Sequence, residues 1–214
     1  MKSIALFGGT GRTGLPFLQQ ALEAGHPVKA LARTPEKWSE SLRQHPKLTI
    51  VQGDVLNQAD VTQTIAGSEV VVSLFGHTKN SPEWLQTNGT KLIVAAMQEH
   101  KVQRILSLSG GGLPFPEKDQ PKFMDHLIRT VMKLFFAKVL NDAIKHHQVL
   151  QESGLNWSIV RGPRLTDAPA SGSYRVGWVG VDAGTQISRA DLAAFLLTLI
   201  EDKQYDFQMP FVTN

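Results

Sequence analysis

Cysteine is absent from this sequence of 214 residues, and tyrosine occurs only twice. The lack of cysteine excludes disulfides, thiolate nucleophiles, iron–sulfur clusters and cysteine-based zinc sites within the chain. No stretch reaches the roughly 20 apolar residues that a membrane-spanning helix needs, and the first residues lead into a strand rather than a signal-peptide core. We therefore expect a soluble, cytoplasmic protein. The net charge of +3 is too small and too dispersed to predict binding to nucleic acid.

Short apolar segments alternate with longer segments of helical period. We expect strands at residues 3–7, 28–32, 48–51, 70–74, 105–108 and 158–160, and helices at residues 15–24, 60–65, 84–99, 122–152 and 189–201. Apolar strands separated by helices are typical of a parallel sheet that is covered on both faces. The sequence thus predicts an α/β, Rossmann-like, doubly wound sheet that forms a single domain over residues 1–214.

A glycine-rich segment stands between the first predicted strand and the first predicted helix. Gly8, Gly11 and Gly14 form the spacing G-x-x-G-x-x-G. Glycine lets the backbone approach a pyrophosphate, and the free N–H groups and dipole at the start of a helix favour its negative charge. The hydroxyl groups of Thr10 and Thr13 are additional donors. The segment therefore predicts a dinucleotide-binding loop.

The end of the second predicted strand bears on the choice of cofactor. An acidic residue here would bind the ribose 2′-hydroxyl of NAD, but this sequence has Arg33. A guanidinium suits a 2′-phosphate, and Arg12 is positioned in the loop to bind the same group. NADP(H) is therefore the expected cofactor. The alternative is that Arg33 is a solvated residue at the start of a loop.

Two further strand ends contribute to the expected site. Asp54 follows the third strand, where its carboxylate either accepts a hydrogen bond from adenine or caps the helix that follows. Leu74 and Gly76 end the fourth strand, and glycine again permits a close approach of the backbone to the cofactor.

Several of these motifs together resemble the atypical short-chain dehydrogenases/reductases of the NmrA-like group, and among them the NADPH-dependent flavin reductases. The resemblance rests on residues 8–14, 53–56, 59–61, 66–67, 74–76, 88–97, 152–155 and 160–163. It implies that residues 8–14 contact the pyrophosphate, Arg33 the 2′-phosphate, and Asp54 and Val55 the adenine. It further implies that Gly76 and Ser109 line the ribose and nicotinamide. At Arg164 the sequence departs from the flavin reductases, which have a histidine there.

The catalytic pair of ordinary short-chain dehydrogenases is missing. Those enzymes use a Tyr whose pKa is lowered by a Lys four residues later. Here Trp178 follows Tyr174 at that distance, and Met209 follows Tyr205. Hydride transfer without this pair favours an electron-poor, planar acceptor such as a flavin, quinone or bilin, with Ser109 polarising the acceptor or the carboxamide.

A substrate cleft is expected between the loops 76–82, 110–121 and 162–175. Candidate substrate contacts are His77, Leu113 and Arg164, although Arg164 is equally interpreted as a surface cation. His77, which is nearest to the expected cofactor, is favoured as a proton donor over His146 and His147. Of the latter two at least one should be solvated, because neighbouring residues cannot share one face of a helix. No group of residues has the spacing of a metal site.

An apolar stripe runs along the long helix predicted at residues 122–152. It consists of Phe123, Leu127, Val131, Leu134, Phe135 and Leu140. Core packing that includes a pocket wall is the first interpretation. A dimer face and a weak contact with a membrane surface are the alternatives. Monomer and homodimer both remain open.

The sequence as a whole predicts an NADPH-dependent reductase that acts on a small planar molecule. The alternative from another class is a redox sensor without turnover, in which NADP(H) orders the loop 110–121 to regulate a partner. A nucleotide-sugar epimerase or dehydratase is the weakest interpretation, because those enzymes also use the missing pair.

Overall fold

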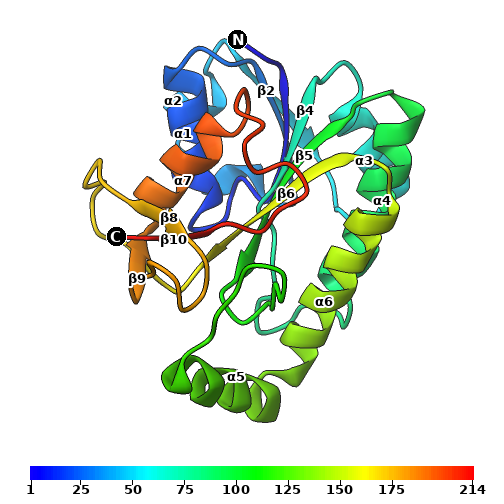
Figure 1. Cartoon of the computed structure of the whole chain (residues 1–214). Coiled ribbons are helices and arrows are strands. Elements are labelled where there is room, and N and C mark those ends of the chain that lie inside the picture. The colour runs from blue at the N-terminus through cyan, green and yellow to red at the C-terminus, as the bar shows by residue number, and fades with distance from the viewer.

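A central sheet of eight strands organises the computed structural model, which describes residues 1–214 (Figure 1). The strands in spatial order are β3 (Leu48–Gln52), β2 (Val28–Ala32), β1 (Ile4–Phe7), β4 (Val70–Ser73), β5 (Arg104–Gly110), β6 (Asn156–Gly162), β10 (Phe211–Thr213) and β8 (Arg175–Gly177). The neighbours from β3 to β10 pair in parallel, and β8 is antiparallel to β10. The doubly wound, parallel α/β architecture is therefore confirmed.

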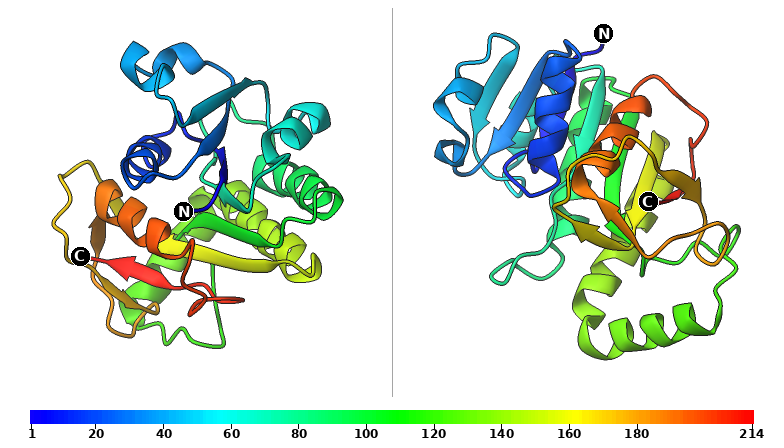
Figure 2. Two further views of the ribbon diagram at one scale, coloured as in Figure 1. Left: turned by 90° about the horizontal axis from the view of Figure 1, so that it is seen from above. Right: turned by 90° about the vertical axis from the view of Figure 1, so that its left-hand side faces the viewer.

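Helices cover both faces of the sheet (Figures 1 and 2). One face carries α1 (Gly14–Glu23) and α7 (Arg189–Thr198), and the other carries α3 (Gln58–Ile65), α4 (Leu85–Glu99) and α6 (Ala137–Glu152). Strand β1 shows why both faces are needed. Ile4 and Leu6 belong to the core cluster on the α1 side, whereas Ala5 and Phe7 belong to the cluster on the α4 side. Alternate side chains point to opposite faces, so a strand that is apolar throughout requires two covering layers.

The six predicted strands and the first helices lie close to their predicted positions. The structure adds short elements that the sequence did not indicate. Between β2 and β3 lie a 3-10 turn, Pro35–Lys37, and the one-turn helix α2 (Glu40–Arg43). Strands β7 (Arg164–Thr166) and β9 (Gln186–Ser188) form a separate parallel pair, and β8 and β10 extend the main sheet.

The long helix predicted at residues 122–152 is in fact two helices. Helix α5 (Phe123–Phe135) ends next to Phe136, whose φ of −129° and ψ of 27° interrupt the helical backbone before α6. The prediction that the apolar stripe packs into the core is wrong for α5, because this helix buries none of its residues. Phe123 is 84% exposed and Phe135 is 76% exposed, and of the stripe only Leu140 is buried. No helix of the protein is long and apolar enough to cross a membrane.

Candidate dinucleotide site

The loop between β1 and α1 has a geometry that only glycine permits at two positions. Gly8 has a φ of +84°, and a Cβ atom there would lie 2.5 Å from the backbone nitrogen of Phe75. A Cβ atom on Gly14 would lie 2.0 Å from the carbonyl oxygen of Gly8. Both distances are far below van der Waals contact, so side chains are excluded. The two glycines bring the start of α1 against the loop and the loop against the end of β4.

The backbone N–H groups at the start of α1 are free to bind an anion. The N-cap residue Thr13 makes no side-chain hydrogen bond to the helix. The N–H groups of Arg12, Thr13 and Gly14 have no acceptor within the protein. Uncapped N–H groups at the positive end of a helix dipole attract a phosphate oxygen. The free donors thus lie where the sequence predicts that the pyrophosphate of a dinucleotide binds.

Trp38 fixes the loop from the side and was not identified from the sequence. Its side chain is 3% exposed, and its indole Nε1 donates a hydrogen bond of 3.1 Å to the carbonyl oxygen of Gly9. A Cβ atom on Gly9 would also lie 3.1 Å from the Trp38 ring. A lone tryptophan between two strands gives no periodic signal, so only the folded structure reveals this contact.

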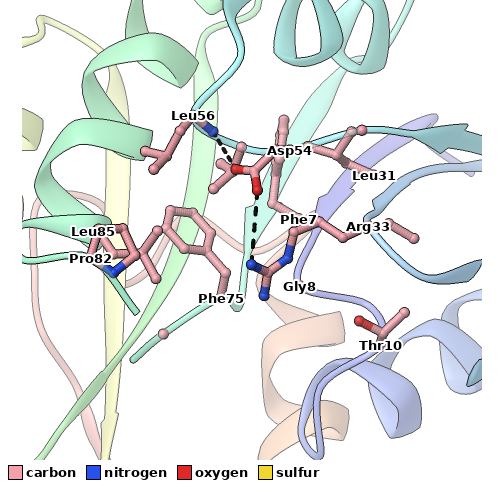
Figure 3. Close-up of a pocket in the computed structure, with 14 residues that line it drawn as sticks. Phe7, Gly8, Thr10, Leu31, Arg33, Asp54, Leu56, Phe75, Pro82 and Leu85 are labelled. Carbon is pink, nitrogen blue, oxygen red and sulfur yellow. Dashed lines mark hydrogen bonds and ion pairs between the residues drawn. The ribbon is translucent and has the colours of Figure 1, made fainter. Parts of the chain in front are cut away.

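A pocket of about 200 Å³ opens beside the loop, across the ends of β1 to β4 (Figure 3). Six residues predicted to bind the cofactor line it: Gly8, Thr10, Arg33, Asp54, Val55 and Gly76. Leu74, also predicted there, is 8% exposed and belongs to the core instead. The pocket lies at the carboxyl ends of parallel strands, where doubly wound sheets bind their ligands.

Two oppositely charged residues face each other across this pocket. A guanidinium nitrogen of Arg33 lies 3.8 Å from a carboxylate oxygen of Asp54, and the Arg33 side chain is 67% exposed. The other oxygen of Asp54 accepts the backbone N–H of Leu56 at 2.9 Å, as Figure 3 shows. Asn57, not Asp54, caps α3. This excludes the capping alternative for Asp54 and leaves its carboxylate facing the pocket.

Arg12 has a different partner from Arg33. Its guanidinium pairs with Asp167, which also accepts a hydrogen bond of 2.6 Å from Arg189. The hydrogen bond from Arg12 lowers the pKa of Asp167, and the charge of Arg189 contributes to the same effect. The sequence predicted that Arg12 and Arg33 bind the same 2′-phosphate. The structure does not bring the two side chains together, because Arg12 pairs with Asp167 instead.

His77 lies directly after Gly76 and contacts a buried carboxylate. Its Nε2 is 2.6 Å from Asp142 of α6, and its side chain is 14% exposed. Asp142 also accepts the backbone N–H groups of Gln86 and Thr87 at 2.8 and 2.9 Å, in the first turn of α4. Burial opposes the ionisation of Asp142, but these hydrogen bonds outweigh it and lower its pKa. An ionised aspartate thus orients the His77 ring.

The two neighbouring histidines of α6 differ in burial: His146 is buried and His147 is half-buried. His146 is 1% exposed, and its nitrogens lie 2.8 Å from the hydroxyl of Thr90 and 3.0 Å from that of Ser107. Burial lowers its pKa to about 4, so the ring is neutral at physiological pH. His147 packs edge-on against Trp157, and burial lowers its pKa as well. Of the two, only His147 is partly accessible to solvent, whereas the sequence predicted that at least one would be solvated.

The remaining predicted residues lie in different surroundings. Ser109 is 9% exposed and lies opposite Arg161 in the pairing of β5 with β6. Leu113 is 2% exposed and packs in the core cluster on the α4 side, so its side chain is withdrawn from solvent. Arg164 is on the surface and donates a hydrogen bond of 3.0 Å to the side-chain oxygen of Gln186.

A buried ion pair anchors the loop 110–121. Asp119 accepts two hydrogen bonds from Arg161, at 2.8 and 2.9 Å, and one from Arg129 of α5 at 2.9 Å. It also accepts the backbone N–H groups of Phe115 and Val179. Arg161 is fully buried and also donates to the carbonyl oxygen of Leu113. The predicted loop is thus present, and β6, α5 and the segment after β8 hold it in place.

Both tyrosines lie away from the pocket. Tyr174 and Tyr205 each pack against Phe195 of α7, with ring centroids 5.6 and 5.8 Å apart. Burial raises the pKa of Tyr205, and the charge of Asp202 adds to this effect. A tyrosine that donates a proton in catalysis needs the opposite shift. Neither residue replaces the missing Tyr–Lys pair.

The loop before α1 and the pocket across the strand ends define a dinucleotide-binding protein. Comparison with known families specifies this class further. The family model described as NAD(P)H-binding matches residues 8–203, and the chain belongs to this family. The expected nicotinamide dinucleotide cofactor is thereby confirmed at the level of the family.

Two curated relatives are each similar to part of the chain. An uncharacterised chloroplastic protein of Arabidopsis thaliana is 26% identical over 181 residues, which are 80% of this chain and 62% of that protein. A 3-beta-hydroxysteroid dehydrogenase of Mycolicibacterium neoaurum is 33% identical over 115 residues, 48% of this chain and 30% of that enzyme. The chain thus spans less than two thirds of the length of these relatives.

The fold also matches a solved structure. A short-chain dehydrogenase/reductase of Veillonella parvula, in complex with NADP, superposes with a TM-score of 0.84 at 17% identity, over 100% of this chain and 94% of that one. At this identity the likeness concerns the fold, and it agrees with the short-chain-reductase architecture expected from the motifs.

Proposed function

We propose that this protein is an NADPH-dependent reductase that transfers hydride to a planar, conjugated acceptor such as a flavin, a quinone or a bilin. The observation that carries the proposal is Arg33, which projects its exposed guanidinium into the pocket of an NAD(P)H-binding protein. The absence of a Tyr–Lys pair favours an acceptor that delocalises charge and so needs no strong acid beside it.

The residues divide the binding of the cofactor among them. The N–H groups of Arg12, Thr13 and Gly14 bind the pyrophosphate, Arg33 binds the 2′-phosphate, and Asp54 and Val55 contact the adenine. Arg33 would form charge-assisted hydrogen bonds to the phosphate in place of its long contact with Asp54. Gly76 leaves open space beside the ribose, since a Cβ atom there would have no neighbour within 4 Å. The bound cofactor supplies the hydride.

Reduction of a conjugated acceptor by two electrons takes up one hydride and one proton. His77 is the proposed source of that proton, because it directly follows the pocket residue Gly76 and is oriented by Asp142. With Nε2 held by the carboxylate, Nδ1 is the nitrogen that remains available to donate to the acceptor. Reprotonation from water restores the ring. The ionised Asp142 stabilises the imidazolium before transfer, as a buried carboxylate does for the histidine of a catalytic triad.

The sensor alternative depends on a loop that the cofactor orders. The Asp119 contacts already fix the loop 110–121 to three other parts of the protein. Cofactor binding therefore has little to order there, and we favour turnover.

The test follows NADPH consumption by absorbance with free flavins, quinones and biliverdin as acceptors. We expect steady consumption with at least one acceptor, and loss of NADPH-dependent activity in Arg33→Asp. The matched control is Arg43→Asp, which changes the same charge on the exposed side of α2. Tight NADPH binding without consumption by any acceptor would contradict a reductase and favour the sensor. Equal loss of NADPH-dependent activity in both variants would contradict the assignment of Arg33 to the cofactor site.

A further inference from the structure

Helix α5 exposes an apolar face that is unusually large. In Figure 1 it projects from the lower end of the molecule, beyond the sheet, and the second view of Figure 2 agrees. Nine apolar residues from the start of α5 to the first turn of α6 are more than a third exposed: Phe123, Met124, Leu127, Ile128, Val131, Leu134, Phe135, Phe136 and Val139. Taking about 200 Å² for a fully exposed phenylalanine, they expose on the order of 900 Å². Monomeric proteins rarely expose apolar patches above a few hundred Å².

The orientation of α5 is the reverse of that of an ordinary surface helix. Its least exposed residues are Asp125, Arg129 and Met132, which lie on the side facing the protein. Arg129 ties this side to the loop 110–121 through its hydrogen bond to Asp119. A surface helix normally turns its apolar stripe to the core and its charges to water. Here a buried polar contact holds the apolar stripe outward, where only a partner can cover it.

The charges around the apolar face indicate what covers it. Lys122 precedes α5, Lys133 is in its last turn, and Lys138 is in the first turn of α6, and all three are exposed. None of them takes part in an ion pair. The only acid on α5 is Asp125, whose carboxylate accepts the backbone N–H of Lys122 at 2.8 Å. The exposed apolar segment thus has three lysines at its ends and along its length that no acidic side chain compensates.

A second copy of the chain fits this face poorly. In a two-fold pair of antiparallel α5 helices, the lysine before one helix would approach those at the end of the other, and like charges would oppose each other. An anionic lipid surface complements both features, since acyl chains take up the phenylalanines and headgroups attract the lysines. We propose that α5 docks on anionic membrane surfaces, lying in the plane of the interface with its apolar face in the lipid. This inference is independent of the proposed reductase activity.

The test is flotation of the full-length protein with vesicles of phosphatidylcholine alone or with equal parts of phosphatidylglycerol. We expect binding to the anionic vesicles, weakened by salt. Phe123→Ser and Phe135→Ser should each weaken it by about tenfold or more, the effect of one buried phenylalanine. Lys122→Glu and Lys133→Glu should each weaken it by at least about fivefold. All four side chains are exposed, so unchanged melting temperatures will show that the variants fold.

Two matched controls lie outside α5. Lys203→Glu reverses an exposed charge in the segment after α7, and Phe207→Ser removes a phenylalanine that is 53% exposed. Both should bind as the wild type does. Failure of the wild type to float with anionic vesicles would overturn the proposal, as would binding that the α5 variants leave unchanged. A dimer that dissociates in Phe135→Ser, without vesicle binding by the wild type, would assign the face to a second copy.

Discussion

Asp119→Asn is expected to destabilise the protein strongly although the side chain keeps its shape. Asp119 is 1% exposed and neutralises Arg161, which is fully buried. Asparagine removes the charge and turns an amide group toward a guanidinium that can only donate. Breaking one side of a buried ion pair costs about 3–5 kcal/mol. In a domain of this size, each kcal/mol changes the melting temperature by about 2–4 °C, which gives a decrease of roughly 6–20 °C.

The measurement is urea denaturation followed by circular dichroism, with thermal melting beside it. Asp182→Asn is the matched control, because Asp182 is 73% exposed and its ion pair with Arg175 is long, at 4.0 Å. It should change the free energy of unfolding by less than about 0.5 kcal/mol. The double variant Asp119→Asn with Arg161→Met removes the buried charge altogether. The decrease in the free energy of unfolding of the double variant should therefore be smaller than the sum of the decreases in the two single variants.

The same ion pair predicts a dependence on pH. Burial raises the pKa of Asp119, but the hydrogen bonds and charge of Arg161 outweigh it, so the net shift is downward. The folded state then holds its proton less tightly than the unfolded state, whose pKa is about 4. The stabilisation is present above that pH and is lost as the pH falls through the folded value. Two results would refute this reasoning. One is that Asp119→Asn lowers the free energy of unfolding by less than about 1 kcal/mol at neutral pH, and the other is that the difference in stability between wild type and variant persists in acid.

Three further predictions concern the site and its surroundings. Gly14→Ala should abolish NADPH binding, measured by a titration of NADPH fluorescence, because the added Cβ atom would collide with the Gly8 carbonyl. The control Gly110→Ala should bind NADPH normally, because a Cβ atom at residue 110 would have no neighbour within 4 Å. Burial lowers the pKa of His146 to about 4. The free energy of unfolding should therefore fall by up to about 3 kcal/mol as the pH drops from about 6.5 toward that value. A free energy that does not change over this range would contradict the burial of His146 as a neutral ring. His77→Gln should lower turnover by about 10²-fold and leave NADPH affinity unchanged; turnover close to that of the wild type would exclude His77 as the proton donor.

The parts of the fold that the sequence predicted are those with strong local signals. The apolar runs of β1 and β4 are buried on both faces, and a side chain at Gly8 or Gly14 of the loop would collide with neighbouring backbone. Strands β7 to β10 have three residues each, which is too short for a period to appear. Their positions follow from tertiary pairing, so local pattern could not reveal them.

Helix α5 shows a second kind of limit. The period of its apolar residues correctly predicted a helix, but period alone does not state which side faces the protein. That choice is made by Arg129, through a contact with Asp119 ten residues earlier. The site shows the same limit. The sequence predicted six of the residues that line the pocket, but neither the hydrogen bond from Trp38 to Gly9 nor the pairing of Arg12 with Asp167.

The most direct test of the proposed cofactor site is calorimetric titration of the wild type and of Arg33→Gln with NADPH and NADH. One charge-assisted hydrogen bond contributes about 1.5–3 kcal/mol, so the wild type should bind NADPH about 10- to 100-fold more tightly than NADH. In Arg33→Gln this preference should disappear through weaker binding of NADPH, with the affinity for NADH unchanged. Equal affinities for the two nucleotides in the wild type, or a preference for NADPH that survives the substitution, would contradict the assignment of Arg33 to the 2′-phosphate.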